Sequence, residues 1–452
     1  VVTELATPPP PPPPPTGLTV RVNPSTTFQT IRGLQAASQD GSMECKAYSR
    51  YQSALHGRLV NEVGLTRLTT ALRSGMEDTM DFFPLWQSGQ WTMTQWRPEW
   101  FTPVNDNADP FVTDSSKFHW SFLDWHIEKV IQPIRARLLA DRGDSLYVVL
   151  TVVDFKTATH GSLTRPFDVV KNPDEYAELV TMAFIHLQQK YGWVPNALEL
   201  TLEPEHSAVY GVDLGRAAVA ARARLAGKGF HPDIIAPSTT GLLNGSTYWD
   251  QMLTIPGARQ ALSVLGYHRY TQISDSAVRF IGDRYTRDNV PTAMLEYNEA
   301  TFDHLYQDLT VGMTSTWMAF AAAFCSQSPN PTNKGVYYGV GIADTLNPTI
   351  NITNEAKLYR QVFNYARPGA VRLGTTAGDT LLRPLAFRNA NGAIVAVIQT
   401  RGAATFNVTG LPLGTYGVNW STPTGQWNVE EAQRVGVDSV RVTMPAAGVL
   451  TV

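Results

Sequence analysis

The stretch NPDEYAELVTMAFIHLQQKYG, residues 172–192, is followed by ALELTLEP, residues 197–204, and together they indicate the fold. Asn172 is a candidate N-cap, Pro173 suits the first helical position, and Glu175 suits the third. Apolar residues then recur with helical spacing up to Gly192, which can end the helix in the left-handed conformation. Residues 197–202 follow as a short apolar strand. The segment therefore predicts one helix-to-strand unit of an α/β fold.

The same alternation of short apolar runs and helix-like stretches extends over most of the chain, from Gly17 to about Asn364. It contains eight candidate strands, at residues 31–36, 64–72, 146–153, 197–202, 233–237, 264–267, 293–295 and 335–341. Eight strands separated by helices predict a (β/α)8 (TIM) barrel, which we place at residues 31–364.

The texture changes after residue 364, where short apolar runs are separated by Gly, Pro and Asn turns. This pattern is typical of an antiparallel β-sandwich, which we place at residues 365–452. Residues 17–30 have the same texture, and we expect them to add one or more strands to that sandwich. Residues 1–16 contain the unbroken proline run 8–15, which favours a stiff polyproline II linker. A ligand for a proline-binding domain is the alternative interpretation of this run.

The bulk composition excludes several classes of function. A formal net charge of −3 provides no basic field for nucleic acid or an anionic membrane. An uninterrupted apolar run of about 18 residues is missing, so we expect no transmembrane segment. Two cysteines, Cys45 and Cys325, make neither a disulfide framework nor a zinc cluster, although one disulfide between them stays possible. We expect no metal and no cofactor, because metal and phosphate motifs are missing from the sequence. We also expect a monomer.

Two glutamates stand where a barrel of this kind would carry its catalytic groups. Glu203 follows the apparent fourth strand and precedes Pro204, which stops that strand, and Glu296 ends the apparent seventh strand. Active-site residues of such barrels lie at the carboxyl ends of strands. Cleavage of a glycosidic bond needs two carboxyl groups. Surface or capping carboxylates are commoner than catalytic ones, but a pair at strands four and seven makes Glu203 and Glu296 a strong candidate catalytic pair. In the enzymes that this arrangement resembles, the strand-four residue is the general acid/base and the strand-seven residue the nucleophile, which implies these roles for Glu203 and Glu296.

The sequence resembles the clan of retaining glycoside hydrolases that carry these residues on strands four and seven, and within it glycoside hydrolase family 30. The resemblance lies in four further segments: FQTIRGL (28–34), GLTR (64–67) with RSGMED (73–78), YHRY (267–270), and YARPGAVR (365–372). It implies a retaining β-glycosidase with a carbohydrate substrate. The clan usually has Asn before the strand-four Glu, where it binds the sugar 2-hydroxyl, and here Leu202 takes that place. The substrate could differ at C2, Glu205 or His206 could replace the contact, or activity could be weak.

The resemblance and the strand pattern together suggest further substrate-binding residues. Arg67 on strand two is expected near the nucleophile, where it would keep Glu296 ionised, with a structural ion pair as the alternative. After strand six, Tyr270 is expected to donate a hydrogen bond to the nucleophile, and His268 to face the pocket unless it is a satisfied structural group. Asp78 and Asp154 follow strands two and three and could bind sugar hydroxyls.

Aromatic residues are expected at the mouth of the barrel. The loop 82–101 after strand two holds four tryptophans, and Trp91 represents our prediction of sugar stacking there. A loop that packs on its own hydrophobic cluster is the alternative. Tyr337, with its neighbour Tyr338, is a similar candidate on the apparent eighth strand.

The sequence therefore predicts a secreted or cell-surface-tethered enzyme, held through the proline-rich linker, that degrades a β-linked polysaccharide. Two alternatives remain open: a carbohydrate-binding barrel that has lost efficient catalysis, and a glycolipid β-glucosidase like the glucosylceramidases. The sugar, the linkage, and endo or exo action depend on loops that vary freely on this fold.

Overall fold

The computed structural model of the protein describes residues 17–155, 168–328, 335–436 and 439–452. The predicted linker, residues 1–16, lies outside the described residues. The chain folds into two compact units. Residues 29–368 form one unit, and residues up to 28 together with 369–452 form the other.

The larger unit is a closed barrel of eight parallel strands. The strands are β2 (Gly33–Ala37), β3 (Leu65–Arg73), β4 (Tyr147–Val153), β5 (Ala197–Glu199), β6 (Asp233–Gly241), β7 (Val264–Thr271), β8 (Thr292–Glu296) and β9 (Thr314–Trp317). Their side chains are nearly all buried, as expected for parallel strands that face a packed interior on one side and helices on the other. The predicted barrel is therefore confirmed.

One predicted barrel strand is wrong. The eighth strand is β9, not the predicted segment 335–341, whose strand β11 (Tyr338–Gly341) lies in a separate three-stranded sheet between β10 (Ala323–Ser326) and β12 (Thr349–Ile352). The sequence of β9, TSTW, is short and polar, so it gives a weak strand signal, whereas residues 335–341 are rich in Tyr, Val and Gly.

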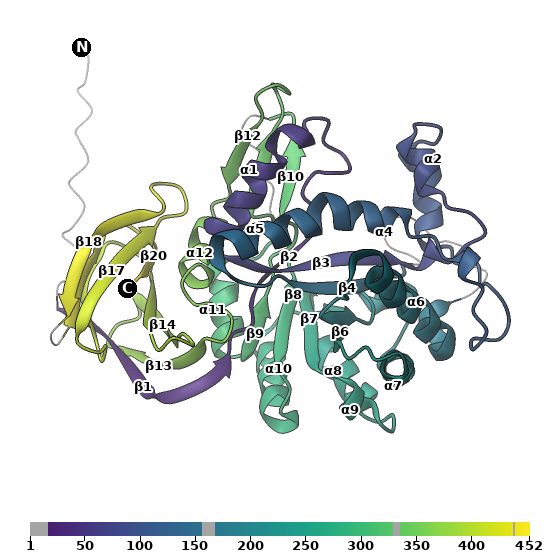
Figure 1. Ribbon diagram of the computed structural model, residues 1–452. Helices are drawn as coiled ribbons and strands as arrows, with labels where there is room; N and C mark the ends of the chain where they lie inside the picture. The colour runs from purple at the N-terminus through teal and green to yellow at the C-terminus, as the bar shows by residue number, and fades with distance from the viewer. Residues whose placement is uncertain (1–16, 156–167, 329–334, 437–438) are drawn as a thin grey trace, which may run out of the picture. The chain divides into compact units, whose positions relative to one another are not determined.

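Helices follow the barrel strands and cover their outer face (Figure 1). The longer ones are α1 (Tyr48–Asn61), α5 (Gln132–Arg142), α6 (Pro173–Tyr191), α7 (Gly211–Gly227), α8 (Leu242–Met252), α10 (Asp275–Asp288), α11 (Phe302–Thr310) and α12 (Ala356–Phe363), with the short α9 at Ala258–Ala261. The helix predicted from residues 172–192 is α6, and Gly192 ends it with a left-handed φ of 73°. Asn172 precedes it, but its side chain bonds the Asp168 carbonyl instead of a helix N–H.

A long excursion, residues 74–120, separates β3 from the helices that lead to β4. It holds the short helices α2 (Phe83–Gln87) and α3 (Met93–Trp96), and α4 (Ser121–His126) follows it. Figure 1 shows α2 projecting beyond the body of the barrel. An isolated bridge between Glu77 and Phe118 joins the two ends of the excursion, so it leaves the carboxyl end of β3 and returns to the same place.

The smaller unit is a nine-stranded, mostly antiparallel sheet in the order β18-β17-β20-β15-β14-β13-β1-β16-β19. Its strands are β1 (Leu18–Thr30), β13 (Val371–Ala377), β14 (Leu382–Arg388), β15 (Ile394–Thr400), β16 (Ala404–Thr409), β17 (Gly414–Ser421), β18 (Val429–Gly436), β19 (Ser439–Met444) and β20 (Gly448–Thr451). The two edge strands, β18 and β19, contact each other, so the sheet curves around one apolar core. The appended β-domain is therefore confirmed, and β1 lies in its sheet between β13 and β16.

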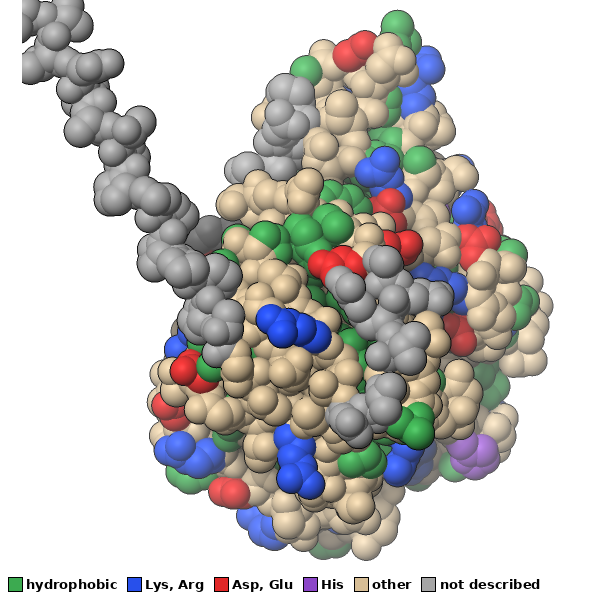
Figure 2. Space-filling model, turned by 90° about the vertical axis from the view of Figure 1, so that its left-hand side faces the viewer, with side chains coloured by type: hydrophobic (Ala, Val, Ile, Leu, Met, Phe, Trp, Pro, Cys, Tyr) green, Lys and Arg blue, Asp and Glu red, His purple; other side chains and the backbone are tan. Residues whose placement is uncertain are grey.

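The surface carries few charges. The face drawn in Figure 2 mixes Lys and Arg with Asp and Glu, without a large field of one sign among the described side chains. Within the described residues, no helix is both long and apolar enough to span a membrane.

Candidate functional site

Glu203 is held at the carboxyl end of the fourth barrel strand by an unusual backbone. Beyond β5 the chain stays bonded between its neighbours, because the Leu202 N–H donates to Val152 and the Glu203 N–H donates to the Ser238 carbonyl at 3.0 Å. Glu203 and Ser238 both have positive φ, 48° and 52°. Such a conformation costs about 1–3 kcal/mol for a residue with a side chain and concentrates at functional sites. This backbone conformation orients the Glu203 side chain just beyond the end of β5.

Glu296 is the last residue of β8, the seventh barrel strand. Both glutamates are largely buried, with 8 % of their surface exposed. The Tyr270 hydroxyl donates to Glu296 Oε1 at 2.8 Å. One carboxylate oxygen of Glu203, one of Glu296 and one ring nitrogen of His268 all lie within 4.8 Å of one another. The fold therefore brings the two carboxylates predicted from sequence together at the carboxyl end of the barrel.

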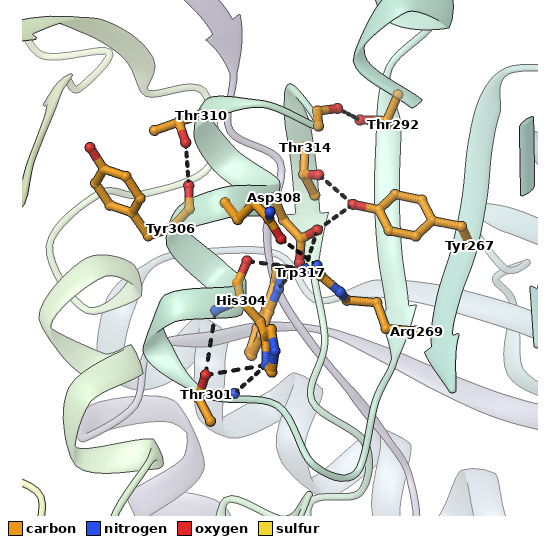
Figure 3. Close-up of polar contacts among 12 residues, drawn as sticks. Tyr267, Arg269, Thr292, Thr301, His304, Tyr306, Asp308, Thr310, Thr314 and Trp317 are labelled. Atoms are coloured by element: carbon orange, nitrogen blue, oxygen red, sulfur yellow. Dashed lines mark hydrogen bonds and ion pairs between the residues drawn. The ribbon is translucent and has the colours of Figure 1, made fainter. Parts of the chain in front are cut away.

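Strand β7, which pairs with β8 in the barrel, is fixed from its outer side. Tyr267 and Arg269 point away from the barrel and both bind the buried Asp308 of α11, at 2.8 and 2.9 Å (Figure 3). The indole N–H of Trp317 in β9 donates to the same carboxylate at 3.1 Å. Because side chains alternate along a strand, this anchor leaves His268 and Tyr270 on the inner face.

His268 contacts the acid/base candidate directly. Its Nδ1 lies 3.1 Å from Glu203 Oε1, and His206 Nε2 lies 3.2 Å from Glu203 Oε2. His268 is fully buried, whereas the His206 side chain is 34 % exposed. The sequence predicted that His268 faces the pocket, but it did not predict that His268 and His206 would both contact the Glu203 carboxylate.

These contacts set the resting ionisation of the site. Burial raises the pKa of Glu203, but hydrogen bonds from His206 and His268 outweigh burial and hold that pKa well below its usual value. Burial, with the negative charge of Glu203, raises the pKa of Glu296, although His268 and Tyr270 oppose the rise. Burial lowers the pKa of His268, but its hydrogen bond to Glu203 and the charges of Glu296, Glu203 and Glu199 raise it to about 9. These shifts favour a protonated His268 beside an ionised Glu203.

The residues after Leu202 differ in whether they could replace the Asn side chain that the resemblance leads us to expect at position 202. The Glu205 carboxylate accepts hydrogen bonds from the Thr240 and Gly241 N–H groups and from the Asn244 amide. It is therefore committed to the start of α8 and does not fill the role we considered for it. His206, in contact with Glu203 and partly exposed, is better placed for a ligand hydroxyl.

Two further carboxylates lie beyond the same ends of the strands. Asp154 directly follows β4 and is buried, and its carbonyl accepts a hydrogen bond from the Ser207 hydroxyl. Asp78 follows β3 by five residues, is buried, and accepts hydrogen bonds from the backbone and the hydroxyl of Thr79. Burial raises the pKa of Asp78. Their contact with a sugar stays a prediction.

The aromatic residues of the excursion pack mainly on one another. Phe83, Trp86, Trp96 and Phe122 form a cluster in which Trp86 and Trp96 stack with centroids 4.9 Å apart. The alternative interpretation, a loop folded on its own cluster, therefore describes most of this segment. Trp91 stays partly exposed and stacks on Phe82 at 5.1 Å, so one face of its ring is the best candidate for sugar stacking.

Two predicted binding residues are wrong in position. Arg67 is the third residue of β3, near the amino end of the strand, where it bonds Gln35 and lies 3.7 Å from the ring centre of Tyr147. It therefore lies far along the strand from the catalytic end, and burial lowers its pKa to about 10. Tyr337 has no exposed surface, and its hydroxyl bridges the Gln35 carbonyl and the Ala319 N–H, so it presents no face to a sugar.

Arg73, the last residue of β3, lies toward the excursion instead. Its guanidinium lies 3.4 Å from the ring centre of Trp100 and 3.8 Å from that of Phe122, and the residue is 8 % exposed. Cation–π contacts of this kind stabilise a desolvated guanidinium. Burial lowers the pKa of Arg73.

Two groups of described residues have metal-ligand geometry. The first is Glu203, His268 and Glu296. A histidine must be neutral to bind a metal, and the raised pKa of His268 keeps it protonated at neutral pH, so this group suits proton transfer better than metal binding. The second is Asp106 of the excursion with Glu175 and Glu178 of α6, and it shares no residue with the first group.

Comparisons with known proteins give no match by sequence but several by structure. No protein-family model matches the sequence, and no curated protein shows significant sequence similarity to it. Solved structures do match. The catalytic domain of a GH30 xylanase C from Talaromyces cellulolyticus has a TM-score of 0.66 and 15 % identity, covering 96 % of this chain and 99 % of its own.

Two other solved structures are similar to the same extent. A GH30 endoxylanase from Clostridium papyrosolvens has a TM-score of 0.63 and 16 % identity, with 96 % and 98 % coverage of this chain and its own. An endo-β1,6-glucanase has a TM-score of 0.65 and 15 % identity, with 96 % and 93 % coverage. At these identities the likeness establishes the fold: a (β/α)8 barrel with an appended β-domain, as in glycoside hydrolase family 30 structures.

Proposed function

We propose that the protein is a retaining β-glycoside hydrolase that cleaves a β-linked polysaccharide or oligosaccharide by double displacement. The observation that carries this proposal is the approach of the Glu203 and Glu296 oxygens to within 4.8 Å at the carboxyl end of the barrel. Retaining enzymes hold their carboxyl groups about 5–5.5 Å apart, whereas inverting enzymes need about 6.5–9.5 Å to admit a water molecule. The xylanases and the endo-β1,6-glucanase among the structural neighbours support a carbohydrate substrate.

In the first displacement, Glu296 attacks the anomeric carbon and Glu203 gives a proton to the oxygen of the leaving sugar. The bond from carbon to the leaving oxygen breaks as the bond from carbon to Glu296 forms. Glu296 must be ionised for this attack. The hydrogen bond from Tyr270 stabilises that charge and orients the attacking oxygen.

The proton that Glu203 needs is held by its neighbour before the reaction. The resting state has Glu203 ionised and His268 protonated, with 3.1 Å between Nδ1 and Oε1. Transfer across this hydrogen bond yields a protonated Glu203 and a neutral His268 without changing the total charge. Because the groups interact strongly, the proton belongs to the pair. A bound sugar that excludes water favours the transfer, because it removes the remaining solvation of the Glu203 carboxylate, whereas His268 is already fully buried.

In the second displacement, Glu203 acts as the base. It removes a proton from a water molecule, whose oxygen attacks the anomeric carbon and releases Glu296. Two inversions at the same carbon restore the original β configuration. His206, partly exposed beside Glu203 Oε2, is positioned to contact the water or a sugar hydroxyl.

A carbohydrate-binding barrel without efficient catalysis is the second candidate, and Leu202 favours it. Its side chain cannot donate the hydrogen bond to the sugar 2-hydroxyl that the resemblance leads us to expect. Hydrogen bonds at this hydroxyl strengthen in the transition state. Losing one donor of this kind reduces rates by about 10²–10³-fold in well-studied enzymes.

A panel of aryl β-glycosides and β-linked polysaccharides tests the proposal, with the wild type and two variants. Glu296→Ala is expected to lose turnover on every substrate. Glu203→Ala is expected to keep activity on glycosides with good leaving groups, which need little protonation, and added azide is expected to restore its slow second step. Asp283→Asn, on the exposed side of α10, serves as the matched acidic control and is expected to keep full activity. Sugar binding by the wild type without turnover would favour the binding barrel.

A further inference from the structure

A second cluster of acidic side chains lies where the excursion meets α6. Asp106 belongs to the loop 102–114 of the excursion, and Glu175 and Glu178 lie one turn apart near the start of α6. One carboxylate oxygen of each lies within 4.8 Å of the others. Glu77, which follows β3, joins them by accepting a hydrogen bond from the Asp106 N–H at 2.9 Å.

Four oxygens of this cluster are buried and have no hydrogen-bond partner: Asn105 Oδ1, Asp106 Oδ1, Glu175 Oε2 and Glu178 Oε2. The second polar atom of each side chain is already used. The Asn105 amide donates to Glu175 Oε1, and Glu178 Oε1 accepts from Arg224 at 2.9 Å. The Glu178 side chain is only 1 % exposed, so bulk solvent does not reach its second oxygen. Buried oxygens without partners are costly and require an explanation.

The charge of the cluster is also uncompensated. Four carboxylates, from Glu77, Asp106, Glu175 and Glu178, face one cation in contact with them among the described residues, Arg224. The cluster therefore holds more acidic side chains than cations in contact with them.

We propose that Asn105, Asp106, Glu175 and Glu178 bind a calcium ion, with Glu77 beside them. Calcium binds six to eight oxygens at about 2.3–2.6 Å, so two of its ligands stand at most about 5 Å apart. One carboxylate oxygen each of Asp106, Glu175 and Glu178 meets this limit, since these three lie within 4.8 Å of one another. The donors are all carboxylate or amide oxygens, and neither His nor Cys belongs to the described cluster. Magnesium demands a nearly ideal octahedron at about 2.0–2.1 Å, which ligands from a loop and a helix meet less readily.

The ion would join the excursion to the barrel helices. The loop supplies Asn105 and Asp106, α6 supplies Glu175 and Glu178, and Arg224 of α7 already holds one oxygen of Glu178. The excursion also carries Asp78 and Trp91, so calcium would order the segment that we expect at the mouth of the barrel. The site uses none of the catalytic residues and is independent of the proposed reaction.

Calcium binding is measured by titration calorimetry and by thermal unfolding of the full chain, after treatment with EDTA. The wild type is expected to bind one calcium ion with saturation. Its Tm is expected to rise by about 5 °C when free calcium is about 100 times Kd, while magnesium at the same concentration gives a smaller rise. No heat of binding and no change in Tm at millimolar calcium would overturn the proposal.

Two isosteric variants locate the site, Asp106→Asn in the loop and Glu178→Gln in α6. Each removes one ligand charge and relieves repulsion within the cluster. The metal-free Asp106→Asn variant is therefore expected to unfold at or above the temperature of the metal-free wild type, whereas Glu178→Gln also weakens the ion pair with Arg224 and is expected to unfold at a lower temperature. Each is expected to weaken calcium binding at least tenfold and to lose the calcium-dependent rise in Tm. Asp283→Asn is the control and retains both responses. If Glu178→Gln does not fold, Asp106→Asn decides alone, and an unchanged calcium response in it contradicts the assignment.

Discussion

The exchange of a proton between His268 and Glu203 predicts a specific change in the pH dependence of activity. The change is His268→Asn, whose side-chain amide can still donate a hydrogen bond to Glu203 but cannot carry the proton. In the wild type the pair holds its proton until the pH exceeds the His268 pKa of about 9. Activity on the alkaline side is therefore expected to persist to about pH 9 and then to fall as the pair loses its proton.

The magnitude follows from the environment of the imidazole. The rise in the pKa of His268 from 6.5 to about 9 corresponds to about 3 kcal/mol in favour of the protonated ring, which is fully buried beside Glu203. In the His268→Asn variant the neighbouring side chain cannot hold a proton. Glu203 must then be protonated itself before the reaction, and a carboxyl group loses its proton at a lower pH than the imidazole of His268. We expect the alkaline limb of kcat/KM to move down by at least about two pH units, which at pH 8 is a loss of about 10-fold or more and above pH 9 a loss of about 100-fold.

The assay is kcat/KM on an aryl β-glycoside or a soluble polysaccharide that the wild type cleaves, measured across pH 5–10. Circular dichroism at each pH checks that the variant stays folded. His231→Asn is the matched control, because this histidine is exposed between α7 and β6 and contacts neither catalytic carboxylate. If the alkaline limb of His268→Asn coincides with that of the wild type, the proton does not come from His268 and the reasoning is refuted.

Two further predictions concern the residues that hold the site in place. Tyr270→Phe removes the 2.8 Å hydrogen bond to Glu296 and is expected to lower kcat/KM about 10- to 100-fold with little change in Tm, and an unchanged rate in initial-rate measurements would contradict this role. Asp308→Ala leaves the buried Arg269 guanidinium without its carboxylate and is expected to cost about 3–5 kcal/mol of unfolding free energy in urea titrations, whereas a loss below about 1 kcal/mol would mean that the network of Figure 3 does not anchor β7.

The residues that could be predicted from the sequence are those whose signal is local. Glu203 and Glu296 each end an apolar run, so their places at the rim follow from strand periodicity and chain order. Tyr270 was expected from the resemblance of the segment YHRY (267–270), and the structure extends β7 to include it. The helix at residues 172–192 was visible because Pro173 and Gly192 mark its two ends.

The residues that could not be placed depend on depth along a strand or on contacts distant in sequence. Arg67 shares a face with Arg73, but six residues of extended chain, about 20 Å, separate them, so alternation alone does not distinguish the two ends of the barrel. The strand at residues 335–341 has strong β propensity but pairs in another sheet. The cluster of Asp106, Glu175 and Glu178 joins a loop and a helix about 70 residues apart in sequence, and no local motif marks it.

The central claim is that Glu203 and Glu296 act as a retaining pair, and the configuration of the first product tests it most directly. The measurement is proton NMR of the anomeric signals during the first minutes of hydrolysis, before mutarotation mixes them. A β-linked substrate is predicted to give the β anomer first, because two displacements at one carbon restore its configuration. Appearance of the α anomer first would require a single displacement by water and would contradict the assignment of Glu296 as nucleophile.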